Sequence, residues 1–201
     1  LTALAAVSFV AAFGPMVVAL YHVRDRVALI SEAATDPLTG LSNRRALVEA
    51  FEDIEFSPAM AVIMFDLDHF KKTNDVFGHQ IGDDVLKRFA YVVNRHTGGD
   101  AQAYRLGGEE FAIVSTRGGE TRAHELASRI SVAFGAEVVR TPLGPLRSTV
   151  SCGVAAGSPA AMRLIDLLAL ADAALYEAKR TGRNRVVCHS QMDTSELPVS
   201  M

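Results

Sequence analysis

The stretch from Arg105 to Ile113 constrains the fold more than any other part of the sequence. It holds two short apolar runs on either side of Gly107-Gly-Glu-Glu110. Apolar runs of this length are typical of strands, and a glycine pair between them is typical of a tight hairpin turn. The two strands therefore pair antiparallel. The turn also places two like charges side by side, which repel unless a cation lies near them.

The rest of the chain alternates strands and helices. Asp36-Pro-Leu-Thr-Gly40 is a turn cluster that marks the start of the domain, and Ser42 or Asn43 can cap the first helix. Thr141-Pro-Leu-Gly-Pro145 is a turn-rich loop between two strands. The pattern predicts helices over residues 44–55, 70–77, 83–95, 121–134 and 162–181, and strands over 59–66, 137–139, 148–155 and 186–188.

One hairpin among alternating strands and helices favours a mixed or mostly antiparallel sheet covered by helices. This is a ferredoxin-like α+β fold rather than a doubly wound one. The sequence has no glycine-rich phosphate loop of the Walker or dinucleotide type.

Composition narrows the class of protein. The chain has 201 residues, of which 49% are hydrophobic, enough for one domain of ordinary size and a short extra segment. The net charge of −3 argues against a general nucleic-acid-binding surface, since such domains are usually basic. Cys152 and Cys188 lack metal-type spacing, so we interpret them as reduced thiols in a cytosolic domain.

The first twenty residues have no charged side chain, and about twenty apolar residues are needed to cross a bilayer. Gly14 and Pro15 interrupt this stretch, and the cations His22, Arg24 and Arg26 follow it. We therefore expect a transmembrane helix over 1–20, with the following residues in the cytoplasm. A signal peptide would have a basic start, which is missing; a buried core helix is the remaining alternative. Residues 21–35 are expected to form a linker helix, residues 36–190 the domain, and residues 191–201 a flexible tail.

Acidic side chains lie at the ends of two apolar strands. Asp66 and Asp68 end the strand 59–66 and, at positions i and i+2, point to the same side. Together with Glu109 and Glu110 they would form a site for a hard cation, and a partly open oxygen site suits Mg²⁺. The alternative for the two aspartates alone is a solvent-facing strand end.

Two further pairs of polar residues have both a structural and a binding interpretation. Asn74 and Asp83 could recognise guanine, because a carboxylate can accept from two adjacent N–H groups, or each could cap a helix. Lys179 and Arg183 could contact phosphate, or they could act as a cationic end to the helix 162–181.

Taken together, these segments resemble the GGDEF family of diguanylate cyclases. The resemblance runs from about residue 35 to residue 189, with the motifs in family order. The matching stretches are Asp36-Pro-Leu-Thr-Gly-Leu-Ser-Asn-Arg-Arg45, Asp66-Leu-Asp-His-Phe-Lys71, Asn74-Asp75, Gly78-His79, Gly82-Asp83, Gly107-Gly-Glu-Glu-Phe111, Ser151-Cys-Gly-Val154 and Ala171-Asp-Ala-Ala-Leu-Tyr-Glu-Ala-Lys-Arg-Thr-Gly-Arg-Asn184.

The resemblance implies a fold similar to the palm of nucleotidyl cyclases and polymerases, and it implies roles for individual residues. The metal ligands would be Asp66, Glu109, Glu110 and the backbone carbonyl of Leu67. Glu109 is also the implied catalytic residue, as the base for the ribose hydroxyl or as the holder of the ion that activates it. The implied substrate-binding residues are Asn74 and Asp83 for guanine, Lys71, Lys179 and Arg183 for phosphate, and His79 in a role not defined by the resemblance.

The implied reaction joins two GTP molecules into cyclic di-GMP and releases two pyrophosphates. It would use Mg²⁺, two ions in each half-site, with Mn²⁺ as a substitute. One domain holds one GTP, so a two-fold homodimer is required. The full-length protein would be held by its N-terminal helix in the inner membrane of a bacterium, with the catalytic domain in the cytoplasm. The alternative is an inactive module that binds GTP or cyclic di-GMP as a sensor, or that only dimerises.

One departure from the family pattern concerns an inhibitory product site, Arg-x-x-Asp. The corresponding positions here are Gly98-Gly-Asp-Ala101, and Arg95 and Asp100 have the wrong spacing. We therefore expect no product inhibition through that site.

Asp83 bears on the choice of substrate. A branch of the family that makes mixed cyclic dinucleotides is thought to have serine at this guanine-reading position. This chain has aspartate there, which favours GTP over ATP.

Overall fold

The computed structural model describes residues 34–53, 59–157 and 164–192. Within these ranges the strands are β1 (Ser42–Asn43), β2 (Met60–Leu67), β3 (Ala101–Gly107), β4 (Glu110–Ser115), β5 (Val139–Thr141), β6 (Gly144–Leu146), β7 (Val150–Gly157) and β8 (Val186–Cys188). The helices are α2 (Arg44–Asp53), α3 (Phe70–Phe77), α4 (His79–His96), α5 (Gly119–Ala136) and α6 (Leu164–Arg180), followed by the short 3-10 helix η1 (His189–Gln191).

The main sheet has the strand order β1-β3-β4-β2-β7-β8. Its four central strands are antiparallel, whereas β1 pairs parallel with β3 and β8 pairs parallel with β7 at the two edges. Apart from β5 and β6, which form a separate two-stranded sheet, the order along the chain from β2 to β7 is strand, two helices, two strands, helix, strand. This confirms the predicted ferredoxin-like α+β fold with a mostly antiparallel sheet.

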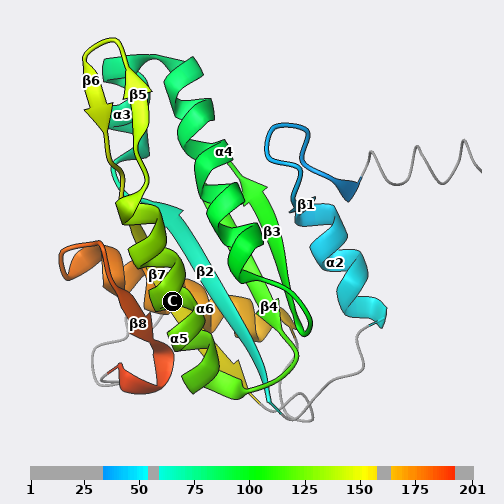
Figure 1. Cartoon of the computed structure of the whole chain (residues 1–201). Coiled ribbons are helices and arrows are strands. Elements are labelled where there is room, and N and C mark those ends of the chain that lie inside the picture. The colour runs from blue at the N-terminus through cyan, green and yellow to red at the C-terminus, as the bar shows by residue number, and fades with distance from the viewer. Residues whose placement is uncertain (1–33, 54–58, 158–163, 193–201) are drawn as a thin grey trace, which may run out of the picture.

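Helices cover both faces of the sheet, and Figure 1 shows α4 and α5 in front of it. Every residue of β2 is buried, and alternate side chains enter the two faces. On the α4–α5 face, the ring of Phe89 lies edge-on to Phe65, Phe111 and Phe134 at centroid distances of 5.6, 4.7 and 4.9 Å. The opposite face packs against α2 and α6, including Leu167. β2 is therefore the rigid centre of the domain, and its C-terminal end is held in place by both layers.

Helix α6 approaches the sheet closely at Gly153. A Cβ atom at this position would lie 2.1 Å from the carbonyl oxygen of Ala171 and 2.2 Å from the backbone nitrogen of Leu175. Only glycine fits between strand and helix there. The glycine therefore sets the distance between β7 and α6.

The structure refines three of the predicted elements. Asn43 is the residue that caps α2, because its Oδ1 accepts a hydrogen bond from the Ala46 N–H at 3.1 Å. Helix α4 begins at His79 and not at Asp83. The predicted loop 141–145 is wrong. β5 and β6 form an antiparallel hairpin with a two-residue turn there, and Gly144 has a φ of 114°. Its prolines suggested a loop, yet Pro145 is tolerated because a two-stranded hairpin has free edges.

Several predictions fall outside the described residues. They are the transmembrane helix over 1–20, nearly all of the linker helix over 21–35, and most of the tail over 191–201. Within the ranges that the structure describes, no helix combines the length and apolar character needed to cross a membrane.

Candidate active site at the β3–β4 turn

The turn between β3 and β4 lies against the end of β2. Asp66 is paired with Glu110 in the register of β2 and β4, and the Leu67 N–H donates to the Glu109 carbonyl oxygen at 3.4 Å. Gly108 has a φ of 49°, a left-handed conformation that glycine adopts without strain. The predicted hairpin is confirmed, and it brings the adjacent glutamates beside the acidic end of the central strand.

A lysine from α6 meets the acids at this point. Lys179 Nζ lies 2.7 Å from Asp66 Oδ2; the Asp66 side chain is 12% exposed, whereas that of Lys179 is 33% exposed. Burial raises the pKa of Asp66, and the hydrogen bond and charge of Lys179 offset only part of this. Burial also raises the pKa of Glu109, and the nearby Asp66 carboxylate adds to the rise. Lys179 therefore supplies part of the positive charge that the acidic turn requires, and it is more than a cationic helix end.

Asp68 has hydrogen-bond partners of its own, although its charge is close enough to add to the rise in the pKa of Asp66. Its carboxylate accepts hydrogen bonds from the hydroxyls of Thr149 and Ser151, both at 2.6 Å, and from the Asn184 N–H at 3.0 Å. Both aspartates are buried, so the alternative of a solvent-facing strand end is wrong. Asp68 ties β2 to β7 and to the loop after α6, and its part in a cation site of four acids stays a prediction.

Asn74 and Asp83 flank the junction of α3 and α4, and neither is a cap. The cap position of α4 is Gly78, and no side chain caps that helix. Asn74 lies inside α3, and its buried Oδ1 has no hydrogen-bond partner within the part of the chain that the structure describes. That oxygen lies over Gly82, where an added Cβ would be 1.9 Å away. The helix-cap alternative is therefore excluded, and a buried polar atom without a partner is left over Gly82, the residue before Asp83.

The other predicted substrate-binding residues are exposed at the surface. Lys71 lies on α3 and His79 is the first residue of α4. Arg183 follows α6 in a left-handed conformation with a φ of 63°, and its charge acts to lower the pKa of Asp66. Lys179 and Arg183 therefore flank the acids from the α6 side, whereas Lys71 and His79 lie on the α3–α4 side.

Sequence reasoning missed one contact of the turn. Arg105 donates to the Gly108 carbonyl oxygen through Nε at 3.2 Å and Nη2 at 2.8 Å, and its Nη1 lies 2.9 Å from Asp36 Oδ1. Burial works to raise the pKa of Asp36, but hydrogen bonds from Thr39 and Arg105 outweigh it and hold the pKa below its ordinary value. The residues around Asp36 predict a local turn and nothing more. No pattern in the sequence connects Asp36 with Arg105, which lies 69 positions further along the chain.

The donor chemistry of the turn fits a hard cation. The carboxylates of Asp66, Glu109 and Glu110 are oxygen ligands, and their mutual repulsion is what a divalent ion would relieve. In the structure itself, no set of three or more His, Cys, Asp or Glu side chains within the described ranges is gathered closely enough to hold a metal. Lys179 takes the place next to Asp66 instead. The metal ligands therefore stay a prediction.

Comparison with known proteins gives the family. The model for "Diguanylate cyclase, GGDEF domain" matches residues 33–185. The chain belongs to the GGDEF domain family of diguanylate cyclases.

Among curated proteins, the probable diguanylate cyclase DgcT of Escherichia coli K12 is 34% identical over 91% of this chain. The alignment covers 42% of DgcT, so the chain spans less than half of that relative. Among solved structures, the GGDEF domain of DgcB from Caulobacter crescentus in complex with c-di-GMP is 34% identical, with a TM-score of 0.74, over 79% of this chain and 97% of that one. A structure of the coiled coil and GGDEF domain of the same protein has 30% identity and a TM-score of 0.77, over 90% and 99% of the two chains.

Proposed function

We propose that this chain is an active diguanylate cyclase. It joins two GTP molecules into cyclic di-GMP and releases two pyrophosphates. The observation that carries the proposal is the arrangement at the β3–β4 turn, where Asp66 and Glu109 have raised pKa values and Lys179 lies 2.7 Å from Asp66. Such a group of acids and cations at the end of a rigid strand is typical of phosphoryl and nucleotidyl transfer.

The proposed roles follow from the positions of the side chains. Lys179 exchanges the Asp66 carboxylate for a triphosphate oxygen when GTP binds, and Arg183 and Lys71 bind further phosphate oxygens. Asn74 and Asp83 contact guanine, because an unpartnered amide oxygen and a carboxylate accept the N–H groups of its edge.

Glu109 acts on the ribose 3′-hydroxyl. A raised pKa makes its carboxylate a better proton acceptor than an ordinary glutamate. Asp66, Glu109, Glu110 and the Leu67 carbonyl would hold Mg²⁺, or Mn²⁺ in its place. When bound, these ions would polarise the phosphate and make the ribose hydroxyl more acidic.

Two copies of the chain complete the site. One domain offers a single guanine site beside a single acidic turn, so each GTP needs the hydroxyl of a GTP on a second copy. We propose a two-fold dimer with the two turns facing each other. Correct placement of the two nucleotides would supply a large part of the acceleration.

The test is incubation of the purified chain with GTP and Mg²⁺, with cyclic di-GMP measured by chromatography. We expect product from dimeric samples and none from Glu109→Gln, which keeps the shape of the side chain and removes its charge. GTP binding without any product from a dimeric sample would favour the alternative of an inactive sensor module. Turnover of Glu109→Gln near the wild-type rate would refute the role of that residue.

We also propose that cyclic di-GMP does not inhibit through residues 98–101. Asp100 is engaged by Arg122, with Nη1 and Oδ2 3.2 Å apart, and Arg95 reaches Tyr91 on its own helix. The test is an inhibition curve with added product. Strong inhibition that persisted in Arg95→Ala and Asp100→Ala would point to a different product site.

The location of the protein is a further proposal that rests on the sequence. The uncharged stretch 1–20 and the cations after it favour an anchor in the inner membrane with the domain in the cytoplasm. Fractionation of cells expressing the full-length protein would test this. Recovery in the membrane fraction, lost on removal of residues 1–20, is the expected result.

A further inference from the structure

A cavity of about 410 Å³ lies on the side of α3 away from Asn74, between that helix and the segment that joins β6 to β7. Helix α3 carries Lys72, Thr73, Val76 and Phe77 on the cavity side, whereas Phe70 and Asn74 face Gly82 of α4. The cavity is thus separate from the proposed guanine site. Its volume lies in the range of small-molecule sites.

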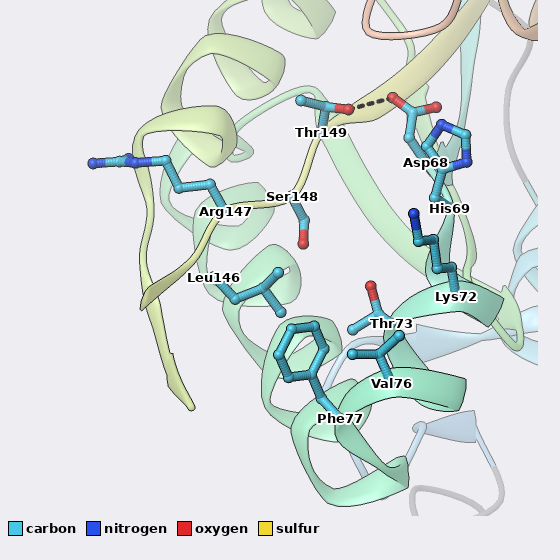
Figure 2. Close-up of a pocket in the computed structure, with 10 residues that line it drawn as sticks. All are labelled: Asp68, His69, Lys72, Thr73, Val76, Phe77, Leu146, Arg147, Ser148 and Thr149. Carbon is cyan, nitrogen blue, oxygen red and sulfur yellow. Dashed lines mark hydrogen bonds between the residues drawn. The ribbon is translucent and has the colours of Figure 1, made fainter. Parts of the chain in front are cut away.

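The two ends of the cavity differ in chemistry. Figure 2 shows Asp68, His69 and Lys72 toward one end, and Val76, Phe77 and Leu146 toward the other. Thr73 and Ser148 lie between them. Arg147 also lines the cavity, but its side chain points away and its guanidinium donates to the Gly135 and Ala136 carbonyls at the end of α5.

Polar groups at the first end and in the middle of the cavity lack partners of their own. Within the part of the chain that the structure describes, the side chains of Lys72, His69, Thr73 and Ser148 make no hydrogen bond or ion pair. Among the residues that the structure describes, Asp68 is the one acid that lines the cavity, and three donors already bind its oxygens. A cationic ligand would find no free carboxylate here, whereas an anion would find an ammonium group and two free hydroxyls.

We propose that this cavity is a second ligand site, for a small organic anion with an aromatic or other apolar body. The acidic group binds Lys72 and the hydroxyls of Thr73 and Ser148, with His69 at the rim. The apolar body packs on Phe77, Leu146 and Val76. The site adjoins Asp68, which holds the loop containing Arg183, but binding at it does not depend on cyclase activity.

The test uses phenyl phosphate as the probe and the full 201-residue chain, with binding measured by calorimetry. Inorganic phosphate and phenol serve as the two halves of the probe, and we expect each half to bind more weakly than the whole. Lys72→Gln removes the charge and should weaken binding by roughly tenfold. Val76→Trp fills the cavity from a side chain that is 52% exposed, so the fold tolerates it and binding should be lost.

Two further variants separate this site from the nucleotide site. Lys87→Gln removes an exposed lysine of α4 and should leave binding unchanged. Lys179→Gln alters the candidate active site and should also leave phenyl phosphate binding unchanged. Absence of saturable binding would overturn the proposal. Binding that survives Lys72→Gln and Val76→Trp, or that is lost in Lys179→Gln, would overturn it as well.

Discussion

Replacement of Asp68 by alanine tests the largest structural claim about the site. The carboxylate is 7% exposed and joins three segments that are far apart in the sequence, through Thr149, Ser151 and Asn184. The alanine variant leaves all three donors without this acceptor. Their surroundings differ, and the differences set the expected loss of stability.

The hydroxyl of Ser151 is fully buried, so water cannot replace the lost acceptor, and an unpaired buried donor costs about 1–3 kcal/mol. Thr149 is half-buried and Asn184 is exposed, so water can reach both; each then loses the net value of a hydrogen bond, about 1 kcal/mol. The sum is a loss of about 3–5 kcal/mol in the free energy of unfolding. Since domains of this size are stable by roughly 5–15 kcal/mol, the variant still folds.

The assay is urea denaturation followed by far-UV circular dichroism, because the chain has no tryptophan for fluorescence. Asp75→Asn, an exposed acid on α3, is the control and should change stability by less than about 0.5 kcal/mol. Asp68→Asn keeps one acceptor oxygen and should fall between the control and the alanine variant. A loss below about 1 kcal/mol for Asp68→Ala, with an unchanged denaturant slope, would refute the reasoning.

Three more substitutions follow from the structure. Gly153→Ala places a methyl group against the backbone of α6 and should destabilise the domain by about 3 kcal/mol, measured by urea denaturation. Gly82→Ala displaces the Asn74 amide and should weaken GTP binding roughly three- to tenfold, measured by calorimetry, with little change in stability. Glu109→Gln should raise the melting temperature at pH 8, because an ionised Glu109 beside Asp66 destabilises the fold. The pKa of Glu109 is raised in the folded protein, so the wild type loses stability as pH rises through that pKa. Below the ordinary glutamate pKa of 4.5, Glu109 is protonated in both the folded and the unfolded protein, and the difference in melting temperature between variant and wild type should vanish.

Matched controls make these results interpretable. Gly135→Ala lies in a helix with open space around the new methyl group, so it should leave stability unchanged or slightly raised. Equal losses in Gly135→Ala and Gly153→Ala would contradict the close approach of α6. Unchanged GTP affinity in Gly82→Ala would contradict the proposed contact between Asn74 and guanine. For Glu109→Gln, the control is Glu125→Gln on the exposed face of α5, and a melting temperature that rises equally in both would show only a general charge effect.

Local patterns in the sequence predicted much of the fold and less of the site. The hairpin at Gly107-Gly108, the short helix Phe70–Phe77 and the buried strand before Asp66 depend on neighbouring residues, so periodicity and turn chemistry predict them. The contacts of Asp68 and Arg105 join residues more than sixty positions apart. Only the assembled sheet brings such residues together, so spacing along the chain could not separate Asp68 from Asp66.

The hydrogen bonds of Arg105 bear on how a signal could reach the turn. One guanidinium contacts both Asp36, where the chain joins the sheet, and the Gly108 carbonyl of the turn. The first segment of the domain is further held by the pairing of β1 with β3. A movement of the chain before Asp36 would therefore move the turn and the sheet edge together, because hydrogen bonds connect that segment to both. Such a joint transmits rotation of the whole domain better than distortion of the turn, so in the dimer proposed above control would act on how the two domains are oriented while the shape of each stays fixed.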